Sequence, residues 1–352
     1  MKKLKKSAIN SLISYGIVIL AFIVCQLTIN AGTMSRSLKG QMIPICVYIV
    51  MAVSLNLVVG ISGELSLGHA GFMSVGAFSG AIFSAWLLEA FHIESTVIRL
   101  ILSMLAGGLF AGIAGVLIGI PVLRLRGDYL AIVTLAFGEI IRNVMNCLYF
   151  SLDEGRLHVS FNNPVLPGKL IVNGPTGATV VQKLSTFPMG FALILFTLFV
   201  VLNLTNSRSG RAIMATRDNR IAAEAMGINV TKYKMMAFVT AAALAGMAGA
   251  LYGLNSSTVD PAKFKFDTSI LVLVFVVLGG IGNIWGSIIA AALLTVLPEL
   301  LRAFSNYRML VYAIVLILVM LATNNPMIRS LSDRLFHRKK PAARAQKGGA
   351  SE

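Results

Sequence analysis

Long apolar runs separated by short polar segments dominate the chain. Crossing a hydrocarbon core of about 30 Å takes roughly 20 apolar residues as a helix, and runs of this kind recur along the sequence. The pattern predicts an all-α, polytopic membrane bundle of about ten spans (between eight and ten). We expect them near residues 11–29, 42–59, 70–88, 99–120, 129–149, 189–204, 235–254, from 268 to the GGIGN sequence, 285–302 and 309–323.

Glycines mark two kinds of position in these runs. Glycine-rich breaks at Gly60–Gly71 and Gly279–Gly286 are either full exits from the membrane or re-entrant turns, because non-helical backbone at membrane depth needs protein or water to satisfy it. Elsewhere, glycines four residues apart predict closely packed helices, since a missing side chain lets two backbones approach in lipid. These pairs are Gly108 and Gly112, Gly115 and Gly119, and Gly249 and Gly253.

The polar segment Asn206–Lys234 differs from an ordinary loop. Asp218 is suited to an N-cap, the following IAAEAM consists mostly of good helix formers, and Gly227 is placed where a C-cap needs a positive φ. A loop that only marked one side of the membrane would not need caps. The segment therefore predicts a rigid, helical docking surface. Its basic residues are Arg208, Arg211, Arg217, Arg220, Lys232 and Lys234.

The distribution of charge orients the predicted spans. Basic clusters mark the cytoplasmic side of a membrane protein, so we expect both termini inside. The expected organisation is a cytoplasmic N-terminus (1–10), a transmembrane domain (11–328) and a basic cytoplasmic tail (329–352). Within the transmembrane domain, 205–234 forms a cytoplasmic loop, and 151–187, which is rich in Pro and Gly turn signals, forms an external loop rather than a domain. A cleaved signal peptide is the alternative for 11–29, but that run is long for one and no A-x-A-like site follows it.

Composition narrows the class further. Only 12% of the 352 residues are charged and 57% are hydrophobic, against roughly 25% charged residues in a soluble domain. The net charge of +16 follows the membrane topology, so we expect membrane lipid as a partner and no nucleic acid.

Candidate chemistry is sparse. Cys25, Cys46 and Cys147 lie in apolar segments without ligand-like spacing, so we expect buried thiols and neither a disulfide nor a metal site. The sequence contains no nucleophile–base pair that would indicate an enzyme. The chain also has no G-x-x-x-x-G-K-[ST] phosphate loop. It is therefore expected to bind no cofactor and not to hydrolyse ATP itself, so any energy it uses must come from another polypeptide or from an ion gradient.

A first group of polar residues lies in the glycine-rich turn after residue 59. Burying a charged group at a helix centre costs roughly 2.5–3.5 kcal/mol on insertion scales, so each such residue needs a reason. Glu64, Ser66 and His69 either line a translocation pathway beside a broken helix or form a polar turn satisfied by neighbouring backbone.

A second group lies in the run 129–149. Glu139 and Arg142 are three residues apart, so they share a helix face and are expected to pair. A structural ion pair and contact with a solute are the two interpretations. Thr134, one to two turns away, adds a hydroxyl group to this candidate pathway.

Four segments together resemble the LivM-type permease subunits of bacterial ABC importers for branched-chain amino acids. They occur in the family's order and cover most of the core from about 50 to 300. The segments are SLNLVVGISGELSLGHAGFMSVGAF (Ser54–Phe78), RGDYLAIVTLAFGEIIR (Arg126–Arg142), RDNRIAAEAMGINVTKYKMMAFVTAAALAGMAGALYG (Arg217–Gly253) and VLGGIGNIWGSIIAAALL (Val277–Leu294).

The resemblance implies a type II-like ABC importer permease in a bacterial inner membrane, with leucine, isoleucine or valine as cargo. It implies a second, LivH-type permease subunit, two ATP-binding subunits that hydrolyse ATP with Mg²⁺, and a soluble extracytoplasmic solute-binding protein. The family's coupling loop, which docks on the ATP-binding subunit, corresponds to Arg217, Asp218, Ala222, Ala223, Glu224, Ala225 and Gly227. Glu224 is expected to be exposed and either to pair with the ATPase or to remain a solvated charge. Transport of urea or short amides, or ion-gradient coupling, are the alternatives.

Overall fold

The computed structural model describes most of the chain between residues 35 and 301. The described residues are 16, 18–19, 22–29, 31, 35–125, 127–153, 156–161, 166–179, 182–301, 307, 310–314 and 316–317. The expected spans at 11–29 and 309–323 are thus described only in part, and the basic termini 1–10 and 329–352 lie outside the described residues. The chain divides into a unit ending at Leu300 and a second from Leu301, and the architecture below is that of the first.

Helices appear wherever the apolar runs predicted them within the described residues. Five are long and apolar enough to cross a membrane: α2 with its π-helical extension η1 (Arg36–Asn56, Leu57–Ser62), α3 (His69–Phe91), α4 (Thr96–Val122), α6 (Phe187–Asn206) and α9 (Val230–Gly253). Helix α5 (Asp128–Asn146) is less apolar, and α10 (Phe266–Gly279) and α11 (Ile284–Leu300) are short apolar helices. A count of ten spans and the cytoplasmic placement of the termini stay predictions.

Glycine contacts hold three of these helices together. Helices α3, α4 and α9 pack on one another more extensively than any other pairs. A Cβ atom on Gly76 of α3 would lie 2.0 Å from the carbonyl oxygen of Gly246 in α9, and one on Gly246 would lie 2.5 Å from that of Gly107 in α4. The close packing predicted from glycine spacing is therefore confirmed, and Gly249 and Gly253 of α9 take part in it against α3.

The break after α2 is a π-helix followed by a turn. All six residues of η1 are buried, and the helix ends at Gly63 with a φ of +77°. The chain then runs without helix to His69, the first residue of α3. The second break, between α10 and α11, contains Gly280 and Gly282, both with positive φ.

A small sheet corrects the all-α expectation. The segment predicted as a turn-rich loop at 151–187 contributes most of a five-stranded antiparallel sheet in the order β2-β1-β3-β4-β5. Its strands are only two to six residues long and lie among proline and glycine turn signals, which hid them even though β2 (RLHVSF) alternates polar and apolar residues. The strands are β1 (Leu148–Asp153), β2 (Arg156–Phe161), β3 (Lys169–Asn173), β4 (Ala178–Thr179) and β5 (Thr258–Val259).

The sheet also explains two smaller differences from expectation. Helix α5 ends at Asn146, before residue 149, because β1 begins at Leu148. Cys147 lies in this corner and is exposed, so the expectation of three buried thiols was wrong for that residue, while Cys46 is buried as expected.

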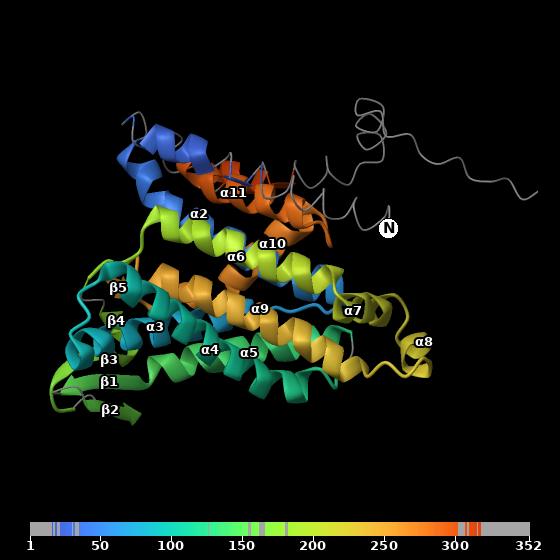
Figure 1. Ribbon diagram of the computed structural model, residues 1–352, viewed down its shortest axis with the longest axis horizontal. Helices are drawn as coiled ribbons and strands as arrows, with labels where there is room; N and C mark the ends of the chain where they lie inside the picture. Colours follow the sequence, from blue (N-terminus) through green and yellow to red (C-terminus); the bar gives the residue numbers. More distant parts are fainter. Residues whose placement is uncertain are drawn as a thin grey trace, which may run out of the picture. The chain divides into compact units, whose positions relative to one another are not determined.

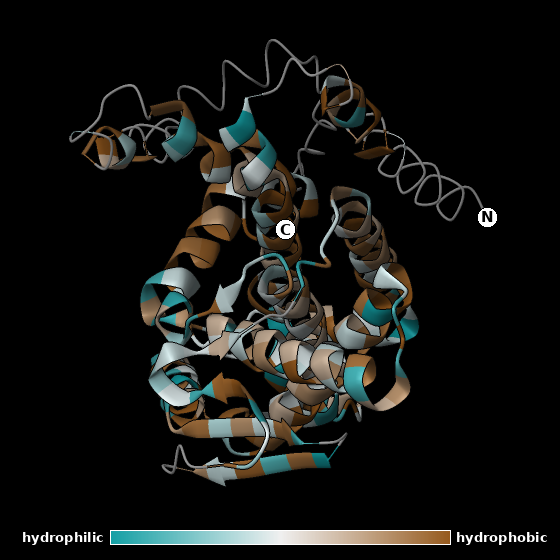
Figure 2. Cartoon of the chain, turned by 90° about the vertical axis from the view of Figure 1, so that its left-hand side faces the viewer, coloured by the Kyte–Doolittle hydropathy of each residue, from teal (hydrophilic) through white to brown (hydrophobic). Residues whose placement is uncertain are grey.

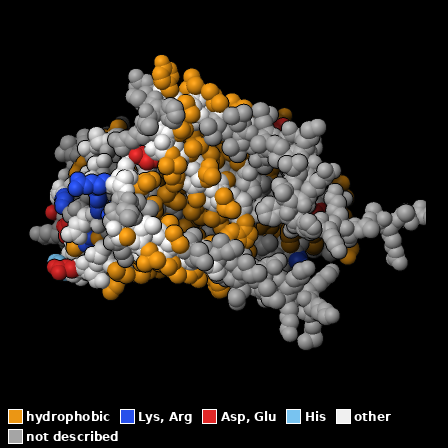
Figure 3. All heavy atoms as spheres, turned by 90° about the horizontal axis from the view of Figure 1, so that it is seen from above, with side chains coloured by type: hydrophobic (Ala, Val, Ile, Leu, Met, Phe, Trp, Pro, Cys, Tyr) orange, Lys and Arg blue, Asp and Glu red, His pale blue; other side chains and the backbone are white. Residues whose placement is uncertain are grey.

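Sheet and docking segment lie at opposite ends of the helices (Figure 1). The strands are at the left of that view, and α7 (Arg208–Asp218) and α8 (Arg220–Ala225) are at the right. Seen from the sheet end, brown hydrophobic residues predominate along the helices (Figure 2). Figure 3 shows a broad band of hydrophobic side chains across the middle of one face, which is the surface expected of a protein surrounded by lipid; a group of Lys and Arg side chains lies at its left, the end that carries the sheet in Figure 1.

We expect Gly246→Ala to destabilise the three-helix contact although alanine favours helices. Its Cβ would lie 2.3 Å from that of Ala111, and overpacking of this kind costs about 1–3 kcal/mol. Gly112→Ala is the matched control, because its Cβ would meet Ala243 only at 3.6 Å and helix propensity should make the change neutral or stabilising. Thermal unfolding of both purified variants measures the difference. Equal melting temperatures would contradict the packing argument.

Candidate functional site

The α7–α8 segment, defined here as Arg208–Gly227, has a side-chain cap at the start of each helix and a glycine cap at the end of α8. The Ser207 side chain accepts a hydrogen bond from the Gly210 N–H at the start of α7. Helix α8 closes with two backbone bonds, from Gly227 N–H to the Glu224 carbonyl and from Ile228 N–H to the Ala223 carbonyl. This pairing around a left-handed glycine is a Schellman motif, and the φ of +78° at Gly227 confirms its predicted C-cap role.

The N-cap of α8 is Asn219 and not Asp218, which corrects the sequence interpretation. Asn219 has extended backbone, and its Oδ1 accepts from the Ala222 N–H at 3.0 Å. Asp218 is the last residue of α7, and its carboxylate binds the guanidinium of the adjacent Arg217 at 3.1 Å. Both residues are good N-caps by type; the shift by one residue arises because α7 continues through Asp218.

Helix α8 presents an apolar surface outward. Ala223 is buried, whereas Ala222 and Ala225 are exposed. The two large side chains on either side of them, Ile221 and Met226, are 80% and 82% exposed, more than any other large hydrophobic residue described. We call these four exposed residues, Ile221, Ala222, Ala225 and Met226, the α8 apolar patch.

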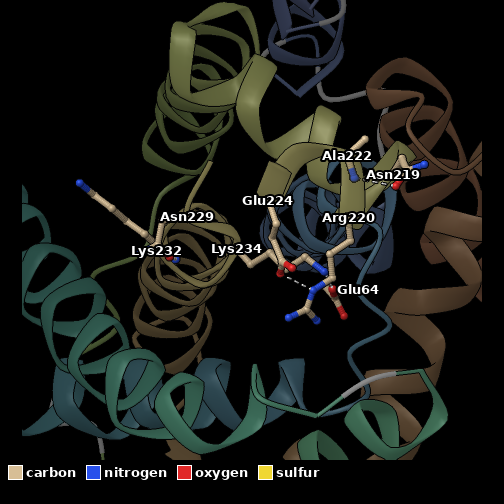
Figure 4. A network of polar contacts seen from close by, with 8 residues as sticks. All are labelled: Glu64, Asn219, Arg220, Ala222, Glu224, Asn229, Lys232 and Lys234. Atoms are coloured by element: carbon tan, nitrogen blue, oxygen red, sulfur yellow. Dashed lines mark hydrogen bonds and ion pairs between the residues drawn. The ribbon is translucent and has the colours of Figure 1, made fainter. Parts of the chain in front are cut away.

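Glu224 is exposed as predicted, but it already has a partner within the chain. Its Oε1 accepts from Arg220 Nε at 2.9 Å, one helical turn away (Figure 4). The side chain remains 49% exposed, so the pair is a surface ion pair that stabilises the helix modestly. A pairing of Glu224 with a partner protein stays a prediction.

Arg217 attaches the α7–α8 segment to the interior of the bundle. Its Nη1 donates to the carbonyl oxygen of Gly60 in η1 at 2.7 Å. The fit is close, because a Cβ on Gly63 would lie 2.4 Å from the Arg217 Cγ. A hydrogen bond from a charged donor is stronger than a neutral one, so this contact links the segment directly to the π-helical break.

Glu64 holds the turn after η1 against α9, through an ion pair with Lys234 in the first turns of that helix. The two side chains are only 13% and 11% exposed. Figure 4 shows both residues beside the α8 residues Arg220 and Glu224. Glu64 is thus the paired polar residue of a turn, which fits the structural interpretation of this position better than contact with a solute.

The two glycine-rich breaks contact each other. Gly282 N–H donates to Asn56 Oδ1, and Asn56 Nδ2 donates to Ser287 Oγ, both at 2.9 Å. A Cβ on Gly60 would lie 2.3 Å from the Gly282 nitrogen. Asn56 and Ser287 are fully buried. Asn56, the last residue of α2, thus satisfies a backbone N–H of the second break and is itself held by Ser287 of α11, as non-helical backbone in a membrane requires.

The remaining residues of the first predicted group are buried in the turn itself. His69 Nε2 lies 2.8 Å from Ser54 Oγ, and both side chains are inaccessible. Thr134 Oγ1 accepts from Leu67 N–H at 3.0 Å, which holds the turn against α5. Ser66 is also buried. Thr134 therefore joins this group rather than Glu139 and Arg142.

The predicted ion pair on α5 is present. Arg142 Nε lies 2.7 Å from Glu139 Oε2, with the side chains 21% and 32% exposed. Glu139 Oε1 also accepts from Phe266 N–H at 3.3 Å, at the start of α10. The pair thus connects α5 to α10, and the structure does not place it with Glu64, Ser66 and His69. Neither group lines the apolar cavity of about 280 Å³ that lies between α3, α4, the end of α5 and strands β1 and β2.

Sequence reasoning missed several members of this network. Asn56 and Ser287 gave no signal because single amides and hydroxyls in apolar runs are common, and their pairing depends on the fold. Lys234 was counted as part of a basic island. Ile221 and Met226 did give a signal, as large apolar residues inside a polar segment, but they were interpreted only as helix formers.

We expect Asn219→Ala to loosen α8 locally. Loss of an N-cap costs typically about 1 kcal/mol, which corresponds to roughly fivefold faster amide exchange across α8 when its opening is local. Asp218→Ala is the matched control, since Asp218 is exposed and caps no helix here. Hydrogen–deuterium exchange on peptides that cover 219–228 measures both. A larger effect from Asp218→Ala would refute the assignment of the cap.

Comparison with known proteins identifies the family. Residues 38–320 match the family described as the permease component of branched-chain amino acid transport systems. The high-affinity branched-chain amino acid transport system permease protein LivM of Salmonella typhimurium is 35% identical over 309 residues, which cover 78% of this chain and 66% of that protein. LivM of Escherichia coli is 33% identical over 334 residues, covering 85% and 69%.

A second permease type is more distant. LivH of Salmonella typhimurium is 26% identical over 280 residues, covering 78% of this chain and 88% of LivH. The chain spans about two thirds of the length of the two LivM proteins, and no solved structure was found to match it significantly. From the match to residues 38–320 and the identity to both LivM proteins, the chain belongs to the family of branched-chain amino acid transport permeases.

Proposed function

We propose that this chain is the membrane-spanning permease subunit of an ABC importer for branched-chain amino acids. The α7–α8 segment is its coupling loop, on the cytoplasmic side of a bacterial inner membrane. A separate ATP-binding subunit docks there and supplies the energy, since the sequence carries no phosphate-binding loop of its own.

The α8 apolar patch is the observation that carries this proposal. Ile221 and Met226 are the most exposed large hydrophobic side chains described, and they project from a basic, water-facing segment rather than from a lipid-facing helix. Apolar anchors surrounded by polar residues are typical of protein interfaces. The caps at Ser207, Asn219 and Gly227 hold the patch rigid, which lowers the entropy lost on docking.

The attachments of the segment support a role in transmitting motion. Arg217 reaches the π-helical break at Gly60, and Glu64, just beyond it, is held by Lys234. A displacement of α8 by a docked ATPase would therefore act first on η1 and, through Asn56, on the Gly282 turn. Broken helices are the elements that move around substrate sites in many transporters.

The proposed assembly contains other chains. The similarity to both LivM and LivH supports a pair of permease subunits, with a LivH-type chain as the second member. Two ATP-binding subunits and an extracytoplasmic solute-binding protein complete it. The few polar groups in the spans, most of them engaged within the bundle, suit an apolar cargo that is selected mainly by the binding protein.

Substituting Ile221 or Met226 with Asp should reduce co-purification of the ATP-binding subunit by tenfold or more, because a charge replaces an anchor in a desolvated interface. Thr231→Asp is the matched control: it introduces the same residue at an exposed position outside the patch, near the start of α9. Size-exclusion profiles of the solubilised chain establish that each variant folds. Wild-type recovery of the ATPase with Ile221→Asp and Met226→Asp would refute the docking assignment.

Uptake of labelled leucine in cells with and without the chain tests transport itself. We expect chain-dependent uptake that is lost on ATP depletion and survives collapse of the proton gradient. Uptake that is lost with the gradient would instead indicate an ion-coupled secondary transporter. If no leucine uptake depends on the chain, the same assay with labelled urea and short amides identifies the alternative cargo and overturns the substrate assignment.

A further inference from the structure

Arg99 is the largest side chain that is fully buried in the described part of the chain, with 2% of its surface exposed. It lies in the first turn of α4, against α3 and the segment after β4. A guanidinium group stays charged in proteins. Its burial therefore requires hydrogen-bond partners and a compensating negative charge.

The described residues supply few hydrogen-bond partners and no compensating negative charge for Arg99. Nη2 donates to Gln182 Oε1 at 2.7 Å, but Nε and Nη1 are buried without a partner. The acidic residues nearest in sequence, Glu89 and Glu94, are exposed, and neither belongs to an ion pair of the described residues. Arg99 also occupies the positive end of the α4 dipole, where a cation is disfavoured and an anion is favoured.

A small cavity adjoins the guanidinium. Its volume is about 10 Å³, and its lining includes the hydroxyl-bearing residues Ser84 and Thr179 together with Gln182. That space is close to the minimum for one water molecule. A phosphate or sulfate group does not fit, whereas a single compact atom does. Gln182 and Thr179 are exposed, so the cavity lies directly beneath the surface at the sheet end.

We propose that Arg99, Gln182 and this cavity form a binding site for one compact anionic acceptor atom. Two sources have this chemistry: a halide ion, or one oxygen of a carboxylate. A water molecule would accept a hydrogen bond but leave the charge uncompensated. The site lies at the end of the helices opposite the α7–α8 segment, where the sheet is (Figure 1). Its occupation by the carboxylate of a transported amino acid rests on the proposed function; its occupation by a halide does not.

Thermal unfolding of the full-length chain in lipid nanodiscs tests the site. Melting temperatures are compared in potassium methanesulfonate, chloride and bromide at equal ionic strength, and in methanesulfonate with added leucine or leucinamide. A ligand that binds only the folded state raises the melting temperature in a saturable way, by a few degrees. We expect this rise with halide or with leucine, and its loss in Arg99→Gln.

The two sources give different results. A halide response without a leucine response assigns the site to an inorganic anion, and a response to leucine but not to leucinamide assigns it to a carboxylate. Arg36→Gln, which removes an exposed arginine, is the matched control and should keep the full response. If Arg99→Gln does not fold, Arg99→Lys should keep the charge and shift the half-maximal anion concentration at least tenfold.

Either of two outcomes overturns the proposal. One is a wild-type melting temperature that responds to neither halide nor leucine. The other is an Arg99 variant whose response equals that of the wild type. Neither outcome depends on uptake or on the ATP-binding subunit, so failure here is distinguishable from failure of the proposed transport function.

Discussion

Close contact between helix backbones is the interaction on which this structure depends. Lipid tails are as apolar as the side chains of the helices, so no hydrophobic effect drives helices together in a membrane. The helices associate instead through van der Waals packing over small residues. Helices α3, α4 and α9 meet where Gly76, Gly107 and Gly246 bring carbonyl oxygens almost into contact with the backbone of the neighbouring helix. This three-helix core is continuous with the rest of the bundle, since α2 packs on α9 and α11 packs on α2.

Polar contacts stabilise the two places where the helices are interrupted. The η1 break accepts a hydrogen bond from Arg217, the turn after it is held by Lys234 and Thr134, and the break before α11 is held by Asn56. Each partner comes from a distant part of the chain. The polar network of the bundle is therefore a set of supports for irregular backbone, and through Arg217 it joins the α7–α8 segment to the η1 break.

The sequence predicts the long helices of this chain well because each is encoded by one long, continuous apolar run. Apolar length gives α2, α3, α4, α6 and α9, and glycine spacing gives the close packing of α4 and α9. The sheet was missed because strands of two to six residues between prolines and glycines look like turns.

The candidate site divides in the same way. Gly227 and the Glu139–Arg142 pair were predictable, since both depend on residues within one helical turn. The Arg217–Gly60 and Asn56–Gly282 contacts join residues 157 and 226 positions apart, and no local pattern encodes them. Asp218 was predicted as the N-cap of α8, whereas Asn219 takes that place; both residue types are good N-caps, and only the length of α7 decides between them.

The π-helical stretch Leu57–Ser62 also sets a register for the chain that follows it. A π-helical turn holds more residues than the α-helical turn it replaces, and one residue in an α-helix corresponds to a rotation of about 100°. The wider turn therefore decides which direction Gly63 and Glu64 face relative to the body of α2. A single-residue deletion inside this stretch would do more than shorten the helix. It would turn Gly63 and Glu64 away from Arg217 of α7 and Lys234 of α9, so the number of residues in this stretch fixes both contacts.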